Sequence, residues 1–431
     1  MNCSWTLNMV EFKVYSGRMK TIMRKICRCF STHLRIFGLA CVLFLFFWIY
    51  QQYLSYRTLI TMAQLRRDLI IPPFADKENG KHDIILSAYM NSGSRFTGRL
   101  LGFINQSFFF YEPLWKFTVW DYYKPPDVRC STTEGSCRTV QTESENEFYK
   151  DQFEKSKEAI VAGIPSDTQP IELMLHVLSS IFGCRLVHMK NVIQERVHDH
   201  AGYAGPSWES YRACLSAFNP KSRCLRQLED TCRNKTHRVL KVLRLSFTTF
   251  KPLMEINPRL KIVHLVRDPR AIIHSRLYSR FYAITNPRKN DSLERNLCEK
   301  MLNDINGVIL LKKHYPDRII VLYYEDLIKN LHVRLKQIYS KLNLTYIREE
   351  AEAWSKVKIN LSPPELGGNF TRDRKNDNAF WWRKFMSWDE VQKVDAHCRD
   401  VYEVLGYKQL SESELRDVNL PSYEIPTFLK L

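Results

Sequence analysis

Short apolar runs alternate with longer amphipathic stretches from about Lys81 onward. The short runs are typical of strands, because they are rich in β-branched and aromatic residues; they are 84–89, 185–189, 239–245, 262–266 and 319–323. The longer stretches repeat apolar residues with helical spacing, over 95–104, 171–181, 271–282, 297–314 and 327–342. Strands separated by helices predict an α/β fold with a mostly parallel central sheet flanked by helices.

A long uncharged run lies near the N-terminus, over residues 36–55. Seven Lys and Arg residues precede it against the single acid Glu11, and Trp48, Tyr50 and Tyr53 stand at its far end. An apolar span of about 17–25 residues crosses a bilayer, and positive charge before it keeps the N-terminus cytosolic. A cleaved signal peptide or a buried core helix fits less well, because no small-residue cleavage site follows Tyr50.

These patterns divide the chain into five parts. We expect a basic cytosolic tail (1–35), a transmembrane signal anchor (36–55), a stem (56–80), a luminal catalytic domain (81–410) and an irregular C-terminal tail (411–431). Within the domain, the polar, cysteine-containing segment 123–167 is predicted to be an insertion or lid. The apolar pattern of the stem is too short to indicate a coiled coil, so a homodimer through the span and stem stays an open alternative.

Composition agrees with a luminal globular domain. Hydrophobic residues make up 45% of the chain, which excludes a wholly disordered protein, and the net charge of +18 suits an anionic ligand. Six Asn-x-Ser/Thr sequons follow the span, at Asn105, Asn234, Asn290, Asn343, Asn360 and Asn369. Eight of the 12 cysteines also follow it. In two clusters, Cys130/Cys137 and Cys214/Cys224/Cys232, the spacing favours short-range disulfides over a zinc site.

Two turns carry the chemistry. The first follows the strand 84–89 and reads Asn91-Ser-Gly-Ser-Arg-Phe-Thr97 before a helix, so it directs backbone N–H groups at an anion. Gly93 and Gly98 have the spacing of an ATPase P-loop, but Arg-Leu follows where that loop needs Lys and Ser or Thr. The turn therefore suits a phosphate-like group and is badly built for Mg-nucleotide hydrolysis.

The second turn follows the strand 262–266 and reads Arg267-Asp-Pro-Arg270 before a helix. Asp268 is a good helix cap and Pro269 suits a first helical turn. Arg267 leaves the strand end, where α/β sheets bind ligands, and Ser275 lies about two turns along the helix. A guanidinium and a hydroxyl so placed can hold a phosphate. Two such turns predict a ligand with two separated anionic ends.

The pair of turns resembles the 5′-phosphosulfate loop and the 3′-phosphate motif of the Golgi carbohydrate 6-O-sulfotransferases. Further stretches match in order, including Phe110-Tyr-Glu-Pro-Leu-Trp115, Val239-Leu-Lys-Val-Leu-Arg-Leu245, Tyr324-Glu-Asp-Leu327 and Trp382-Arg383. The resemblance covers about residues 84–408 and includes the membrane topology. One position departs from it: the family loop usually reads Arg-Ser-Gly-Ser-Ser, and here Asn91 replaces the Arg.

The resemblance implies a P-loop-like sulfotransferase fold and a reaction that uses 3′-phosphoadenosine 5′-phosphosulfate (PAPS). Sulfate would pass to the 6-hydroxyl of a hexose or N-acetylhexosamine in a luminal glycan, without a metal. The implied location is the Golgi membrane, single-pass type II, with no nucleic-acid partner. The residues expected to bind PAPS are Asn91, Ser92, Gly93, Ser94, Arg95, Phe96, Thr97, Arg267, Asp268, Pro269, Arg270 and Ser275.

Three residue roles are hypotheses. Glu112 is the candidate general base for the sugar hydroxyl, ahead of His82, Lys241 and His264, and its alternative is a structural salt bridge. Arg95 or Arg99 is expected to supply the charge that Asn91 lacks. Glu325 and Asp326 are predicted to cap the next helix, and the resemblance alone suggests that Arg383 approaches the nucleotide.

Two other functions compete with this one. The first is a non-catalytic glycan- or anion-binding relative, disabled by the change at Asn91. The second is a Golgi glycosyltransferase, which would share the topology; the Asp-x-Asp motif of its metal-dependent types is absent from the sequence.

Overall fold

The computed structural model describes residues 80–115, 117–118, 121–131, 137–139, 168–189, 192–193, 201–278, 293–356 and 379–431. All of them fall in one compact unit, Ile70–Leu431. The predicted cytosolic tail, the membrane span and all of the stem but its last residue lie outside the described residues, as do three of the sequons. Among the described helices, none combines the length and the apolar character that a membrane crossing needs.

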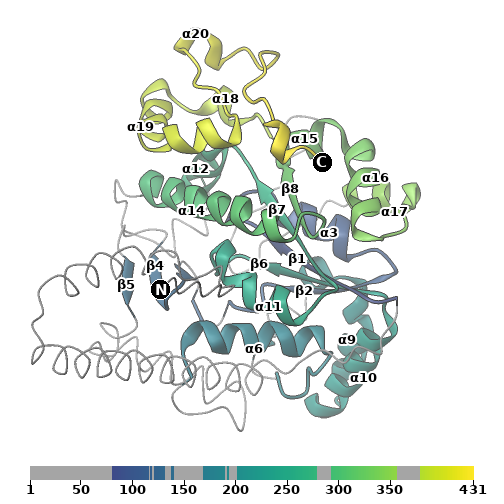
Figure 1. Cartoon of the computed structure of the whole chain (residues 1–431). Coiled ribbons are helices and arrows are strands. Elements are labelled where there is room, and N and C mark those ends of the chain that lie inside the picture. The colour runs from purple at the N-terminus through teal and green to yellow at the C-terminus, as the bar shows by residue number, and fades with distance from the viewer. Residues whose placement is uncertain are drawn as a thin grey trace, which may run out of the picture. The chain divides into compact units, whose positions relative to one another are not determined.

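Five parallel strands form the central sheet, in the order β2-β6-β1-β7-β8. They are β1 (His82–Ser87), β2 (Ser107–Tyr111), β6 (His237–Val242), β7 (Leu260–Val266) and β8 (Ile319–Tyr323). Almost every residue of these strands is buried, as expected when helices cover both faces of a parallel sheet. The predicted parallel sheet flanked by helices is confirmed (Figure 1).

Side chains of the sheet enter two hydrophobic clusters, one on each face. On β1, Ile85 belongs to one cluster, and Ile84 and Leu86 to the other. The second cluster is completed by α3 (Ser94–Gly102), α15 (Tyr324–Lys329), α16 (Leu331–Leu342) and α17 (Arg348–Lys356). The first is completed by α6 (Pro170–Phe182), α9 (Glu209–Ser216), α10 (Lys221–Asn234), α11 (Lys251–Ile256), α12 (Pro269–Leu277), α14 (Leu293–His314), α18 (Trp382–Phe385), α19 (Trp388–Leu405) and α20 (Glu412–Leu415).

Smaller elements complete the described fold. The short helix α8 (Ala201–Ala204) and the 3-10 turns η1 (Pro206–Trp208), η2 (Phe247–Phe250) and η4 (Thr427–Leu429) connect larger ones. A separate antiparallel sheet contains β3 (Asp121–Lys124), β4 (Val128–Ser131) and β5 (Cys137–Thr139). Its strands contain the first residues of the predicted insertion (123–167), and most of the rest of that insertion lies outside the described residues.

Four disulfides join the eight cysteines that follow the predicted span. They are Cys130–Cys137, Cys184–Cys232, Cys214–Cys224 and Cys298–Cys398. The predicted short-range disulfides are confirmed for Cys130–Cys137 and Cys214–Cys224. Cys232 instead pairs outside its cluster, with Cys184, over 48 residues. The last bond spans 100 residues and joins α14 to α19.

Two predicted elements were wrong in detail, and one strand was not predicted. Residues 185–189 form turns after α6, because Arg185 N–H bonds back to Ser180 and Met189 N–H to Leu186. The fifth strand of the sheet is instead β2, an edge strand that the hydrophobic pattern did not predict. The helix expected over 327–342 is broken at Asn330, because its backbone (φ −123°, ψ 41°) leaves the helical region between α15 and α16.

The C-terminal residues, expected to form an irregular tail, carry two short helical turns. Leu415 and Leu429 are each only 1% exposed and belong to the first hydrophobic cluster. The segment also pairs with the end of α19, where Glu424 N–H donates to Gly406 O at 2.7 Å. These contacts bring residues beyond 410 into the core of the domain.

Candidate active site

The first turn connects β1 to α3. Asn91 (φ 66°) and Gly93 (φ 90°) both have left-handed backbone conformations, and α3 begins without a side-chain cap on its N–H groups. The Ser92 hydroxyl donates to Tyr89 O (2.8 Å) and the Thr97 hydroxyl to Gly93 O (3.3 Å), so both shape the turn from within. A Cβ at position 93 would overlap the ring of Tyr324. Glycine is therefore required there both by the left-handed backbone and by the contact with Tyr324. Uncapped N–H groups at a tight glycine turn suit an anion.

The second turn connects β7 to α12. The Asp268 carboxylate accepts a hydrogen bond from Arg270 N–H (2.9 Å) and caps α12, as predicted. The Arg267 guanidinium lies 4.9 Å from the centre of the Tyr324 ring, which also abuts Gly93. The two turns therefore share one aromatic side chain, Tyr324, which was predicted to be part of a matching stretch but not to lie at the site.

The turns lie side by side at one edge of the sheet, because β1 and β7 are neighbouring parallel strands. Arg267 Nη1 donates to Asn91 O (2.9 Å), and Arg276 Nη2 donates to Met90 O (3.4 Å). Asn91 Nδ2 in turn donates to Ser275 Oγ (3.2 Å). The fold thus brings Arg267 and Ser275 to the first turn across more than 170 residues of sequence.

Asp268, Pro269 and Arg270 have a different environment. Arg270 is fully buried, and its Nε and Nη2 atoms donate to the two Asp268 carboxylate oxygens, both at 2.9 Å. The guanidinium also lies over the rings of Trp382 (4.7 Å) and Tyr402 (4.9 Å). These contacts anchor the turn to the core of the domain. Asp268 and Arg270 therefore have a structural role in the second turn.

A buried carboxyl group supports the same turn from the start of α15, which directly follows β8. Glu325 Oε1 accepts from Asp268 N–H (2.8 Å), and Oε2 accepts from the Tyr407 hydroxyl (3.2 Å). Burial, followed by repulsion from Asp268, raises the pKa of Glu325 to about 7. The expectation that Glu325 caps the next helix was wrong, because its carboxyl group holds the neighbouring turn instead. Asp326 does contact α16, through Arg334 (2.5 Å).

Glu112 lies just after β2 with a left-handed backbone (φ 42°) and is 6% exposed. Its carboxylate contacts Lys241 Nζ through Oε1 and Arg244 Nη1 through Oε2 (2.8 Å). Burial alone would raise the pKa of Glu112, but the Lys241 ammonium and then the Arg244 guanidinium outweigh it and lower the pKa to about 2. Burial lowers the pKa of Lys241 to about 8. The carboxylate is thus ionised and ion-paired.

Arg95 and Arg99 were the candidates to replace the charge missing at Asn91. Arg95 lies over the Tyr203 ring (4.7 Å) and donates to its hydroxyl (3.3 Å). Burial would lower the pKa of Arg95, but Tyr111, Tyr203 and Glu112 raise it overall. Arg95 therefore lies near Glu112 and its partners Lys241 and Arg244, which we call the Glu112 cluster. Arg99 is 1% exposed within the domain. Of the two, Arg95 is the better placed.

Two further positions are settled by their contacts. His264 is buried in mid-strand between Tyr89 (3.1 Å) and Ser87 (3.2 Å), and burial lowers its pKa to about 4, so it is a core residue, in line with its low rank as a candidate base. The suggestion that Arg383 approaches the nucleotide was wrong. Its guanidinium is buried and donates to the carbonyls of Glu414 (2.7 Å), Leu415 (3.0 Å) and Leu420 (2.9 Å).

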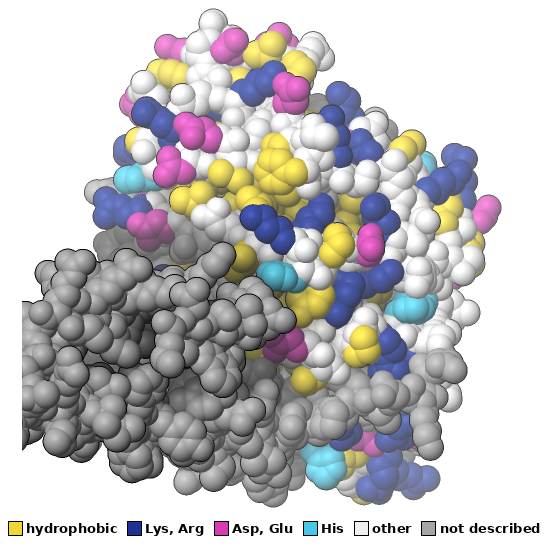
Figure 2. Space-filling model, viewed as in Figure 1, with side chains coloured by type: hydrophobic (Ala, Val, Ile, Leu, Met, Phe, Trp, Pro, Cys, Tyr) yellow, Lys and Arg dark blue, Asp and Glu magenta, His cyan; other side chains and the backbone are white. Residues whose placement is uncertain are grey.

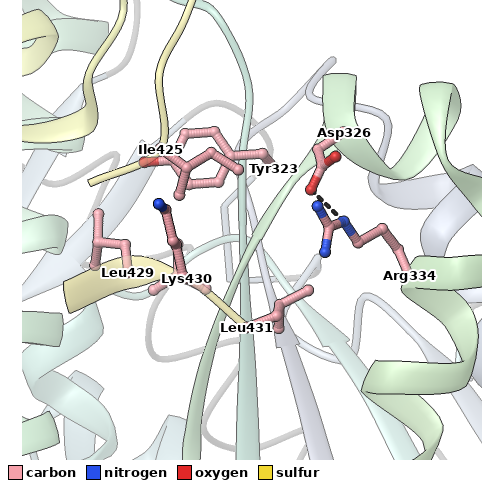
Figure 3. Close-up of a pocket in the computed structure, with 8 residues that line it drawn as sticks. Tyr323, Asp326, Arg334, Ile425, Leu429, Lys430 and Leu431 are labelled. Carbon is pink, nitrogen blue, oxygen red and sulfur yellow. Dashed lines mark ion pairs between the residues drawn. The ribbon is translucent and has the colours of Figure 1, made fainter. Parts of the chain in front are cut away.

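A separate cavity of about 170 Å³ lies between β8 and the C-terminal segment. Figure 3 shows Asp326 and Arg334 paired on one side of it and Ile425, Leu429 and Lys430 on the other. None of the residues predicted for the site lines it. The two turns and the Glu112 cluster, rather than this cavity, form the candidate active site.

Comparison with known proteins identifies the family. Residues 81–412 match the family described as "Sulfotransferase domain". Carbohydrate sulfotransferase 1 of Danio rerio is 23% identical over 398 residues, which cover 83% of this chain and 86% of that protein. Carbohydrate sulfotransferase 5 of Homo sapiens is 24% identical over 374 residues, covering 80% and 82%. The match to carbohydrate sulfotransferases confirms the resemblance found in the motifs.

Among solved structures, retinol dehydratase in a complex with retinol and PAP is similar with a TM-score of 0.37 and 14% identity, covering 78% of this chain and 84% of that one. The assignment rests on the sequence match, which spans both turns, β2 and the helices that support them. The chain belongs to the sulfotransferase family, and it is a sulfotransferase enzyme.

Proposed function

We propose that this sulfotransferase transfers sulfate from PAPS to the 6-hydroxyl of a hexose or N-acetylhexosamine in a luminal glycan. The observation that carries the proposal is the direct contact between the two anion-binding turns, through Arg267 Nη1 and Asn91 O at 2.9 Å. Turns on neighbouring strands suit the two ends of one nucleotide. The names of the relatives support a carbohydrate acceptor, and the motif resemblance supports the 6-position.

The residues present fit PAPS. The uncapped N–H groups of α3 would hold its 5′-phosphosulfate, and Arg267 with Ser275 would hold its 3′-phosphate. When bound, PAPS supplies the sulfuryl group and a good leaving group, so the protein mainly positions reactants and stabilises charge. Figure 2 shows Lys and Arg side chains outnumbering acidic ones in the centre and on the right of the face, as suits an anionic co-substrate.

The Glu112 cluster supports the reacting end of the site. In the described part of the chain, Lys241 and Arg244 pair with no carboxylate other than Glu112, and Arg95 lies close by. Three cations around one carboxylate leave surplus positive charge, which would stabilise a sulfuryl group in transit. Glu112 stays our candidate for the base, although a pKa of about 2 makes it a weaker proton acceptor than an unpaired carboxylate.

Sulfate transfer from labelled PAPS to keratan, chondroitin and N-glycan acceptors, with linkage analysis of the product, tests the proposal. We expect sulfate at the 6-position of one acceptor class, and loss of transfer in Arg267→Ala. Binding of PAPS or glycan without transfer to any acceptor would instead support the non-catalytic alternative.

The role of Glu112 needs its own measurement. Glu112→Gln is expected to abolish turnover and to spare PAPS binding, because the amide keeps the shape of the side chain and cannot take a proton. Lys241→Met is the matched variant for the other half of the ion pair. If Glu112→Gln keeps its turnover, the general base lies elsewhere.

We also propose the Golgi membrane as the location, in a single-pass type II topology. The four disulfides support an oxidising lumen, and the three sequons in the described residues, Asn105, Asn234 and Asn343, are exposed. Intact membranes from expressing cells should protect the domain from added protease, and peptide N-glycosidase should reduce its mass. Cleavage of the domain in sealed membranes would overturn this topology.

A further inference from the structure

Asn91 contacts the second turn with both its backbone and its side chain. Its carbonyl oxygen accepts from Arg267 Nη1 (2.9 Å), and its Nδ2 lies 3.2 Å from Ser275 Oγ and 3.4 Å from Ser275 O. A backbone carbonyl only accepts hydrogen bonds, so the amide must turn its NH₂ group, and not its oxygen, toward Ser275. Asn91 therefore donates to Ser275 while Arg267 donates to Asn91.

The direction of these bonds decides what Ser275 can do. A serine hydroxyl has one proton to donate and two lone pairs to accept with. Because Ser275 Oγ accepts from the Asn91 amide, its own O–H remains available to donate to an anion. A phosphate accepts hydrogen bonds only, so this orientation is the one that a phosphate site needs.

The backbone of Asn91 suits the same role. Its φ of 66° is left-handed, a region that asparagine enters more readily than most residues other than glycine. A long charged side chain enters this backbone region less readily than asparagine, and it carries no short amide to donate to Ser275 as Asn91 does. Asn91, the residue that departs from the family loop, thus has a specific partner in the fold, Ser275.

We infer that Asn91 is a positioning residue, whose amide links the two phosphate-binding turns and orients the Ser275 hydroxyl toward the 3′-phosphate. This inference rests on the proposed function, since it assigns the phosphate to PAPS. Under this inference, the change from Arg to Asn91 is not a loss of function. The position lacks a charge because its amide holds the second turn in place.

A double-mutant cycle on the full-length chain tests the link. Asn91→Gly keeps the left-handed backbone and removes the amide, Ser275→Ala removes the hydroxyl, and the third variant combines them. We expect each single variant to bind adenosine 3′,5′-bisphosphate about threefold to tenfold more weakly, the loss of roughly one hydrogen bond. The double variant should be no weaker than Ser275→Ala, because the two side chains act as one unit.

Kinetics and two controls separate positioning from a general loss of structure. With active protein, the effect of Asn91→Gly should fall on KM for PAPS rather than on kcat, since the 3′-phosphate is held equally before and during transfer. Asn91→Asp, of the same shape but without a donor, should be at least as impaired. Asn91→Arg, which restores the family residue, should bind no more tightly than the unaltered chain. Thermal midpoints confirm that each variant is folded.

Additive effects in the cycle, or tighter binding by Asn91→Arg, overturn the inference and leave the proposed function standing. Unchanged binding in Asn91→Gly overturns it as well. If the unaltered chain binds no adenosine bisphosphate at all, the proposed function fails and the inference fails with it.

Discussion

At the scale of single residues, two positions decide how the anion-binding turns are built. Gly93 allows the Tyr324 ring to approach the first turn, and Glu325 holds the second turn through Asp268 N–H. Neither residue is expected to touch the reacting atoms. Both act by fixing backbone that a ligand would meet.

Gly93→Ala should destabilise the domain and abolish binding of adenosine bisphosphate. The left-handed φ of 90° costs about 1–2 kcal/mol for alanine, and overlap with Tyr324 adds about 1–3 kcal/mol. Gly80→Ala is the matched control, because Gly80 has a similar φ of 84° and open space around its Cβ direction. Chemical denaturation of both variants isolates the Tyr324 contact, and equal losses would show that the contact is unimportant.

Glu325 makes stability depend on pH. Its pKa of about 7 lies above the value of about 4.3 for an exposed glutamate, so the folded state binds the proton more tightly. Its contribution is fully present below about pH 4 and is lost as pH rises through 7. Thermal midpoints of Glu325→Gln should therefore fall less between pH 5 and 8 than those of the unaltered chain. Parallel curves would contradict the raised pKa.

At the scale of elements, the segment that follows α19 (residues 406–431) supports the sheet edge that carries the candidate site. Arg270 Nη2 donates to Lys408 O (2.9 Å), and the Tyr407 hydroxyl donates to Glu325. Arg383 then joins the segment to α18 through three carbonyls. The segment therefore takes part in fixing the second turn, although it lies far from that turn in sequence.

Arg383→Ala should lower the free energy of unfolding by roughly 3–5 kcal/mol, because it removes a buried guanidinium and the donor of one buried and two part-buried carbonyls. Arg383→Lys keeps the charge but lacks the planar guanidinium that donates to three carbonyls at once, so we expect a smaller loss of stability. Affinity for adenosine bisphosphate, measured on folded protein, should not change in either variant. A selective loss of affinity at unchanged stability would restore the nucleotide role that the resemblance suggested.

At the scale of the whole molecule, the disulfides constrain segments that are distant in sequence to different degrees. Cys298–Cys398 closes a loop of 100 residues between α14 and α19, and Cys130–Cys137 closes one of seven. In the chain-entropy account, the longer loop contributes more stability.

Removing Cys298–Cys398 with paired serine substitutions should lower stability by about 4–5 kcal/mol, and removing Cys130–Cys137 by about 2 kcal/mol. Denaturant midpoints of the two variants give the comparison. The expected order follows from loop length alone, so the reverse order would mean that local packing at β4 and β5 outweighs it.

Periodicity in the sequence predicted four of the five strands of the central sheet and the helices between them, because hydrophobic spacing is a local property. It missed β2, where the run Phe108–Phe110 is too short to distinguish strand from helix by spacing. Both turns and Glu112 were also found from local motifs. Tyr324 and Arg244 appeared only within stretches that match the family, because their contacts with Gly93 and Glu112 join segments far apart in sequence. Those two stretches were the signal that could have been used.

The sequence alone determined the class of the fold, the two turns and the kind of ligand they suit, because glycine, charge and helix caps act over a few residues. The tertiary structure alone decided that β1 and β7 are neighbours, that Arg270 and Arg383 are buried supports, and that Asn91 meets Ser275 across 184 residues. Strand order is set by long-range packing of apolar faces, and no local pattern encodes which parallel strands lie side by side.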